Sequence, residues 1–271
     1  MRPVSPAQRR AEIAAVFDSV ADSYDSTGVA WFGPIARRLV DQVAPVPGER
    51  ALDLGCGRGA ALFALADAVG PTGTVTGIDL SVRMVEATRT DVHDRGLSHV
   101  DVQVMDACAP TLPAARYDVV VASFVLFFVP APVAALRAWR PLLAPGGRLG
   151  LSTFGESRTG WLEDVFAPYL PAARFGSAFD TDAGVEHLVA SAGFVDVRTH
   201  AFDLDVVFAD ADQWRAWSWS HGQRAVWERI PAGERAQVQA AAARRLAEHR
   251  DSDGRIRLTQ RIRCTLAKRP E

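Results

Sequence analysis

The amino-acid sequence predicts an α/β fold, a doubly wound and mostly parallel sheet with helices on both faces. Strand-like apolar runs alternate with helical patterns from Glu49 to Phe154, and this alternation is typical of parallel sheets covered by helices. The first strand ends in alternating glycines at Gly55, Gly57 and Gly59. Ligands of such sheets bind beyond the carboxyl ends of the strands, so this turn predicts a binding site.

Hydrophobic period and turn residues place the individual elements. The first helix is amphipathic, and Pro45 and Pro47 stop the second one before the first strand. Helices are expected at 7–24, 35–43, 59–69, 82–95, 132–143 and 185–192. Strands are expected at 50–54, 74–78, 100–105, 117–123, 147–153, 193–197 and 256–267. The intervening stretch 209–250 is too long for a hairpin and is strongly helical in pattern.

Composition limits the partners and the setting. The 271 residues carry a net charge of −2, and 48% of them are hydrophobic, so nothing favours nucleic acid or an anionic membrane. No apolar run is long enough to span a bilayer, and we expect a cytoplasmic protein. Three scattered cysteines predict neither a disulfide framework nor a metal site. The oligomeric state cannot be read from the sequence.

Two acids flank the glycine turn and indicate a nucleoside-containing ligand. Asp53 precedes the turn, where a carboxylate suits an ammonium group better than a phosphate. Asp79 ends the next strand and could accept both hydroxyls of a ribose. The rival is a dinucleotide, because Gly55-x-Gly57-x-x-Ala60 formally fits the Rossmann fingerprint. Asp53 would repel its pyrophosphate, and that fingerprint usually lies nearer the N-terminus.

The segment Asp53–Gly59 together with Asp79 resembles the first two motifs of class I S-adenosylmethionine (SAM) methyltransferases. Phe17–Asp25 also resembles the N-terminal segment of the ubiquinone/menaquinone C-methyltransferase group. The resemblance implies SAM as cofactor and a seven-stranded, Rossmann-like methyltransferase sheet with an antiparallel last strand. It is specific over residues 15–154 and weak beyond 155, where the substrate is chosen.

The sequence has no internal repeat and no low-complexity linker, so we expect one domain over 1–271 with a helical lid. Its parts are a cap (1–46), a cofactor-binding core (47–154), a core continuation (155–208), a lid insertion (209–252) and the last strand (253–271). Residues implied to contact SAM are Tyr24, Asp53, Gly55, Cys56, Gly57, Asp79, Leu80, Met84, Asp106, Ala107 and Ser123. Three of these residues have other interpretations. Tyr24 and Met84 could simply pack in the hydrophobic core, and Asp106 could be an ordinary helix cap.

Aromatic residues dominate the predicted acceptor site. Phe124, Phe127 and Phe128 follow the fourth strand, where many family members place polar groups. Trp214, Trp217 and His221 share one face of a helix in the lid insertion. His221 is the candidate general base, although it could equally be a surface or capping residue, and the tryptophans could simply be lid core.

We therefore expect methyl transfer from SAM to a small, hydrophobic, ring-containing metabolite, on oxygen, carbon or nitrogen. One alternative is a cyclase or isomerase of the same fold that binds SAM without transferring methyl, because the usual polar residue is missing at 124–128. The other alternative is an NAD-dependent oxidoreductase.

Overall fold

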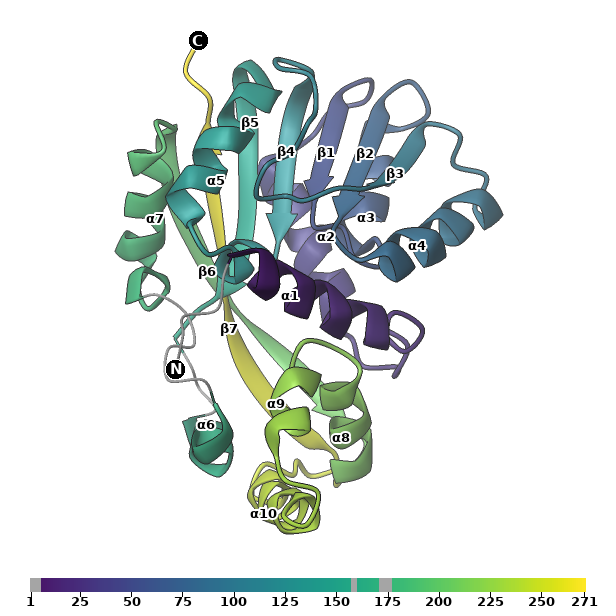
Figure 1. The fold of residues 1–271 in the computed structure, drawn as a ribbon, viewed down its shortest axis with the longest axis vertical. Coiled ribbons are helices and arrows are strands. Elements are labelled where there is room, and N and C mark those ends of the chain that lie inside the picture. The colour runs from purple at the N-terminus through teal and green to yellow at the C-terminus, as the bar shows by residue number, and fades with distance from the viewer. Residues whose placement is uncertain (1–5, 157–159, 171–176) are drawn as a thin grey trace.

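The fold is a seven-stranded sheet between two layers of helices, with a separate group of helices at one end (Figure 1). The computed structural model describes residues 6–156, 160–170 and 177–271. The strand order is β3-β2-β1-β4-β5-β7-β6, and β7 pairs antiparallel with both of its neighbours. The predicted doubly wound, mostly parallel sheet is therefore confirmed.

The strands are β1 (Arg50–Leu54), β2 (Thr74–Asp79), β3 (Val100–Val104), β4 (Tyr117–Ser123), β5 (Leu143–Phe154), β6 (Val195–Phe208) and β7 (Ile256–Lys268). The helices of the sheet layers are α2 (Phe32–Val43), α3 (Ala60–Val69), α4 (Val82–Asp94), α5 (Pro132–Trp139) and α7 (Asp182–Ser191). The remaining helices are α1 (Pro6–Val20), α6 (Gly160–Phe166), α8 (Ala211–Trp219), α9 (Arg224–Arg229) and α10 (Arg235–Ala247).

Buried residues on alternate sides of the central strands hold the layers together. In β4, Val119 and Val121 pack with residues of α2, α3 and α4, whereas Val120 and Ala122 pack with residues of α5 and α7. All four side chains are fully buried. Burial on both faces explains why this strand is a continuous apolar run.

The largest difference from the predicted elements is β6. It extends from Val195 to Phe208 instead of ending near residue 197, and it pairs with β7 along nearly its whole length. From Phe202 onward its apolar residues alternate with Asp203 and Asp205, the pattern of a strand with one solvated face. This alternation is the sequence signal for the longer strand.

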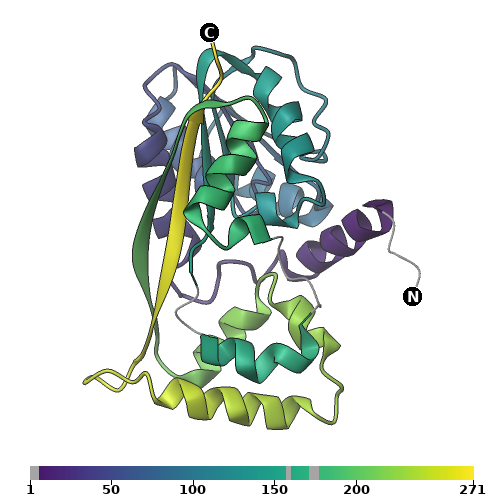
Figure 2. The ribbon, with the colours of Figure 1, turned by 90° about the vertical axis from the view of Figure 1, so that its left-hand side faces the viewer.

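The extended ends of β6 and β7 carry four helices, α6, α8, α9 and α10, which we call the lid after its predicted role. Figures 1 and 2 show these helices grouped at the end of the long β6–β7 ribbon. Their apolar core includes Trp214, Trp227 and Leu246, each at most 2% exposed. Helix α6 packs against α10, so part of the expected core continuation 155–208 lies in the lid.

A buried arginine of β7 ties the end of β5 to the segment that leads into α7. Arg263 of β7 is 3% exposed. Its guanidinium donates to the carbonyl oxygens of Phe154 and Phe179 at 2.7 Å and of Asp180 at 2.9 Å, and it pairs with the Asp182 carboxylate. Because its donors are satisfied, the charge can be buried without a large unpaired penalty.

Helix α1 crosses the carboxyl edge of the sheet and contacts α4 (Figure 1). It ends at Val20, and the rest of the predicted helix up to Tyr24 is a turn. Ion pairs and hydrogen bonds hold it: Arg83 pairs with Asp22 at 2.6 Å, and Arg58 donates to the Ala21 carbonyl at 2.8 Å. The N-terminal segment therefore covers the loops that follow β1 and β2.

Candidate functional site

The glycine turn after β1 is shaped by two different demands. Gly55 has φ +72°, and a Cβ there would lie 2.5 Å from Cγ2 of Val125, so a side chain is excluded by packing as well as by conformation. Gly57 has φ +49°, but a Cβ there would meet no atom within 4 Å. Gly55 thus serves close packing, whereas Gly57 faces open space where a ligand can approach the backbone.

Cys56 has a mainly structural role in the turn. Its backbone N–H donates to the Ile78 carbonyl at 2.9 Å, and its side chain is buried against Gly77 of β2. Burial raises the pKa of its thiol well above the usual value, so the thiol stays protonated and unreactive.

Asp53 is the most unusual ionisable group of the site. It is 1% exposed, no side chain among the described residues donates to its carboxylate oxygens, and only the Leu62 backbone N–H acts to lower its pKa. Burial, reinforced by the nearby charge of Asp79, raises the pKa of Asp53 to about 7. A buried carboxylate without side-chain partners is costly unless a cation compensates it. The ammonium and sulfonium groups of SAM fit this requirement.

Asp79 at the end of β2 organises the turn. One carboxylate oxygen accepts from Gly57 N–H at 2.8 Å and the other from Ser81 N–H at 2.9 Å. Burial raises the pKa of Asp79, although these hydrogen bonds oppose the effect. A carboxylate has about four acceptor positions, so two remain for ribose hydroxyls.

The residues around Asp79 divide between surface and core. Leu80 is half-buried, whereas Met84 is fully buried and packs with Val20 and Ala21 of the N-terminal segment. Tyr24 packs in the same cluster and stacks on Phe32 at 4.6 Å. Burial and the charge of Asp79 raise the pKa of Tyr24, and the contact of Tyr24 with SAM stays a prediction.

Asp106 follows β3 at the same edge of the sheet. Its Oδ1 accepts from Cys108 N–H at 2.7 Å, and its Oδ2 pairs with Arg10 of α1 at 3.3 Å. The Ala107 carbonyl accepts from the Trp139 indole at 2.6 Å, which fixes this loop. The loop thus lies where adenine recognition was predicted, and that role of Asp106 and Ala107 stays a prediction.

The residues after β4 connect the cofactor side to the acceptor side. Ser123 shares a hydrogen bond of 2.8 Å with Ser152 of β5. Phe124 has φ +59°, a strained conformation for a bulky residue that is typical of functional sites. The Phe124 N–H donates to the Ser152 carbonyl of β5 at 3.0 Å. Strand β4 itself ends at Ser123, directly before this strained residue.

Beyond Phe124 lies a continuous group of aromatic rings, which we call the aromatic wall. Its ring centroids are 4.7 to 6.5 Å apart, within the range of favourable aromatic contacts. It comprises Phe17, Trp31, Phe32, Phe124, Phe127, Phe128, Phe154 and Trp217.

The structure thus brings Trp217 together with the three predicted phenylalanines. Trp214 instead contacts Phe166 and Trp227 in the lid core. This agrees with the alternative interpretation of Trp214 as a packing residue of the lid. Four other residues of the wall were not among the predicted acceptor-site residues: Phe17, Trp31, Phe32 and Phe154. The adjacent Trp31-Phe32 pair and the position of Phe154 at the end of β5 were the available signals.

His221 is the polar member of this neighbourhood. Its ring lies 4.4 Å from that of Trp217 and 6.1 Å from that of Phe32. Burial lowers the pKa of His221 to about 4, so the imidazole is neutral at pH 7. A base this weak is poorly matched to abstracting a proton from a phenol or alcohol.

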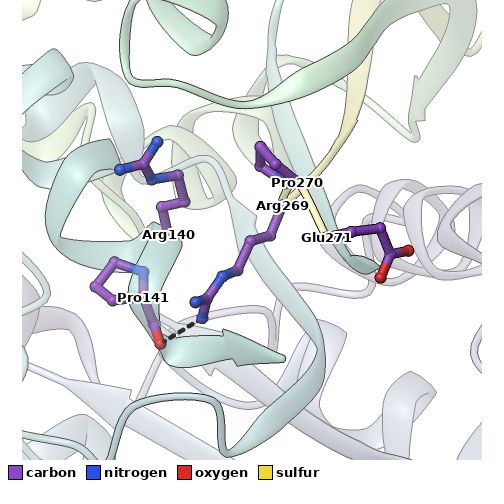
Figure 3. A pocket seen from close by; sticks show the side chains of 5 residues that line it. All are labelled: Arg140, Pro141, Arg269, Pro270 and Glu271. Atoms are coloured by element: carbon purple, nitrogen blue, oxygen red, sulfur yellow. Dashed lines mark hydrogen bonds between the residues drawn. The ribbon is translucent and has the colours of Figure 1, made fainter. Parts of the chain in front are cut away.

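Other parts of the described chain contain no comparable constellation. A cavity of about 230 Å³ is lined by Arg140, Pro141, Arg269, Pro270 and Glu271 (Figure 3). It lies where β5 begins, at the opposite end of that strand from Phe154. Among the described residues, no cluster of potential ligands could hold a metal ion, and no helix has the length and apolarity to cross a membrane.

The fold and the site together define a class of protein. Strand order 3-2-1-4-5-7-6, a glycine turn beside an uncompensated acid, and a second acid after β2 are features of class I SAM-dependent methyltransferases. Residues 51–147 match the family described as "Methyltransferase domain".

Relatives of known activity extend the match over most of the chain. A nocamycin O-methyltransferase from Saccharothrix syringae is 40% identical over 253 residues, covering 86% of this chain and 90% of the relative. The aklanonic acid methyltransferase DauC from Streptomyces sp. (strain C5) is 41% identical over 164 residues, covering 60% of this chain and 74% of the relative. The YcgJ protein of Bacillus subtilis shares the fold with a TM-score of 0.61, at 15% identity over 88% of this chain and 99% of that one.

The chain belongs to the class I SAM-dependent methyltransferases, and SAM is its cofactor. The resemblance found in the sequence is thereby confirmed, and the dinucleotide interpretation of the glycine turn does not apply.

Proposed function

We propose that the protein transfers the methyl group of SAM to an oxygen atom of a hydrophobic, ring-containing small molecule. The observation that carries this proposal is the aromatic wall, which begins at Phe124, next to the Val125 side chain that packs on Gly55. Oxygen is favoured because one relative of closely similar length is named as an O-methyltransferase. The name of a second relative gives aklanonic acid as its substrate, and an organic acid suits the same chemistry.

The wall can accelerate the reaction by positioning and by excluding water. In-line displacement at a sulfonium needs little covalent help, so most of the effect comes from holding the acceptor at attack distance. Flat aromatic surfaces orient a ring system with little loss of side-chain entropy. An apolar surround also strips water from the acceptor oxygen, which makes that oxygen more reactive.

The test begins with calorimetric titration of the protein with SAM, S-adenosylhomocysteine and NADH. Micromolar binding of the first two without NADH binding is the expected result. Aklanonic acid, a simple anthraquinone carboxylic acid and an aliphatic acid of similar mass are then incubated with SAM. We expect a mass gain of one methyl group on an oxygen of the ring compounds only. Equal methylation of the aliphatic acid would contradict the role of the wall.

A cyclase or isomerase that binds SAM without methyl transfer is the other outcome of this experiment. The segment 124–128 supports this alternative because it is apolar and lacks the usual polar residue. Product of unchanged mass, formed while SAM is not consumed, would support it over methyl transfer.

A further inference from the structure

The protonation state of His221 follows from one hydrogen bond. His221 lies in the turn after α8, and its Nδ1 accepts from the Gln223 backbone N–H at 3.3 Å. A ring nitrogen that accepts a hydrogen bond carries its lone pair there, so the neutral imidazole has its proton on Nε2. The same tautomer holds at pH 7 because burial keeps the ring uncharged.

The proton on Nε2 has no acceptor among the described residues. Nε2 is buried and without a hydrogen-bond partner. An unpaired buried donor typically costs about 1–3 kcal/mol, and the nearby face of Trp217 offers at most a weak N–H···π contact. A polar atom held at such a cost inside an apolar wall is typical of a group that meets a ligand.

The neighbours of His221 place it between the lid and the cofactor side. A Cβ on the adjacent Gly222 would lie 3.6 Å from Phe128 and 3.8 Å from Phe17. Phe32, in contact with the His221 ring, stacks on Tyr24, and Tyr24 packs in the cluster of Met84. His221 therefore borders both the acceptor wall and the cluster beside the SAM acids.

We propose that His221 is a positioning residue that donates a hydrogen bond from Nε2–H to the acceptor oxygen, and that it is not the general base. This inference rests on the proposed methyl transfer. It implies an acceptor whose oxygen is already anionic at neutral pH, a carboxylate or an acidic enol. The oxygen lone pair forms the new O–CH₃ bond while the CH₃–S bond breaks and its electron pair returns to sulfur. The negative and positive charges cancel, and no proton is transferred.

Amide substitutions separate donation from proton abstraction. The amide of His221→Gln can place an N–H near the position of Nε2, whereas that of His221→Asn lies nearer Nδ1, and His221→Phe has no donor. We expect kcat/KM for the acceptor to fall at least tenfold in the Phe and Asn variants, about 1.4 kcal/mol. The Gln variant should recover to within about threefold of wild type. A base role predicts that Gln is as impaired as Phe, and that result would overturn the proposal.

Two controls distinguish a positioning role from a merely structural one. SAM affinity measured by calorimetry should stay within twofold of wild type in all three variants. The matched surface variant His93→Gln, at a side chain 90% exposed, should leave kcat/KM unchanged. Equal loss of SAM affinity and acceptor turnover in the His221 variants would indicate a structural role and refute donation.

A spectroscopic readout tests the tautomer independently of turnover. In ¹⁵N-histidine-labelled protein with S-adenosylhomocysteine, the His221 ring at pH 7 should show the Nε2–H tautomer. An Nδ1–H tautomer would refute the inference even if methyl transfer is established. Conversely, absence of turnover with every acceptor would refute the proposed function, whatever tautomer the spectrum shows.

Discussion

The carboxylate of Asp18 in α1 accepts a hydrogen bond of 2.5 Å from the hydroxyl of Ser81, the N-cap residue of α4. That hydroxyl in turn accepts from Met84 N–H at 3.1 Å. One hydrogen-bonded chain thus joins the N-terminal helix to the helix that follows Asp79. The cover over the cofactor loops is therefore tied to the residues predicted to hold the ribose.

Breaking this link should loosen the cover without unfolding the sheet. We expect Asp18→Ala to raise the SAM dissociation constant about three- to tenfold and to speed amide exchange in residues 6–20. The expected loss of stability is about 1 kcal/mol, typical of one lost hydrogen bond, because Ser81 still caps α4. Hydrogen exchange and calorimetry provide the measurements, with exposed Asp67→Ala on α3 as control. Unchanged exchange in α1 would show that the link does not hold the helix.

Asp53 should destabilise the unliganded protein at neutral pH. Because its folded pKa of about 7 lies above the unfolded value of 3.8, the folded state keeps a proton that the unfolded state releases. Stability from this group is full below pH 4 and is lost as the pH rises through 7. We expect Asp53→Asn to raise the free energy of unfolding by about 2–4 kcal/mol at pH 8, and by less than half of that at pH 5. Denaturant titration at both pH values tests this, and equal effects at both would contradict it.

The same carboxylate should make SAM binding depend on pH. A cationic ligand prefers ionised Asp53, so affinity should rise between pH 5.5 and pH 7 by up to about tenfold per pH unit. The amino group of SAM stays charged in this window, since α-amino groups titrate near 7.7–8.0. In Asp53→Asn the dependence should flatten and affinity should fall at pH 7. A slope that persists in the variant would assign the effect to another group.

The two glycines of the turn should respond differently to alanine. Gly55→Ala forces a Cβ to within 2.5 Å of Val125, so we expect a stability loss of about 2–3 kcal/mol, partly recovered by adding Val125→Ala. Gly57→Ala meets no neighbour, so only about 1 kcal/mol of backbone strain should appear, together with a large loss of SAM affinity. Thermal unfolding and calorimetry separate the two effects. A Gly57 variant that binds SAM normally would remove this residue from the site.

Arg263 should be among the least replaceable residues of the chain. Arg263→Met leaves the carbonyls of Phe154 and Phe179 without their donor, and loss of such a buried charged network costs about 3–5 kcal/mol. Its neighbour Arg261 makes an exposed pair with Asp203 at 3.1 Å, so Arg261→Met should cost less than about 1 kcal/mol. Similar midpoints of the two variants in guanidinium unfolding would show that the buried network is not stabilising.

Local patterns were sufficient to predict the cofactor half of the fold. Asp53, Asp79 and Asp106 lie at or just beyond the carboxyl ends of strands identified from their own apolar runs, and parallel strands bring these ends to one edge. These placements need no knowledge of distant residues. Glycine and proline positions also indicated the limits of most strands and helices. The exceptions include β6, which continues to Phe208, and β5, which begins at Leu143 before the Pro145–Gly147 turn signal.

Features that depend on contacts between distant segments could not be predicted. The ion pair of Arg10 with Asp106 spans nearly a hundred residues and has no local signature. Trp31 and Phe154 are ordinary hydrophobic residues until packing brings them to Phe124. The tautomer of His221 depends on the hydrogen bond from the Gln223 backbone N–H. The geometry of this turn cannot be predicted from the pattern of residue types.

The β6–β7 ribbon has a consequence for how such enzymes diversify. Phe208 and Ile256 are paired where the ribbon meets the lid, so the intervening helices enter and leave the sheet at one point. A single continuous stretch of gene can be exchanged there while the cofactor half is inherited unchanged. The exchanged stretch must keep its contacts with the rest of the chain, among them α10 against α6, Trp217 against Trp31, and the hydrogen bond from Gln213 to the Thr27 carbonyl. New acceptor preferences can thus evolve, or be grafted between relatives, as one cassette.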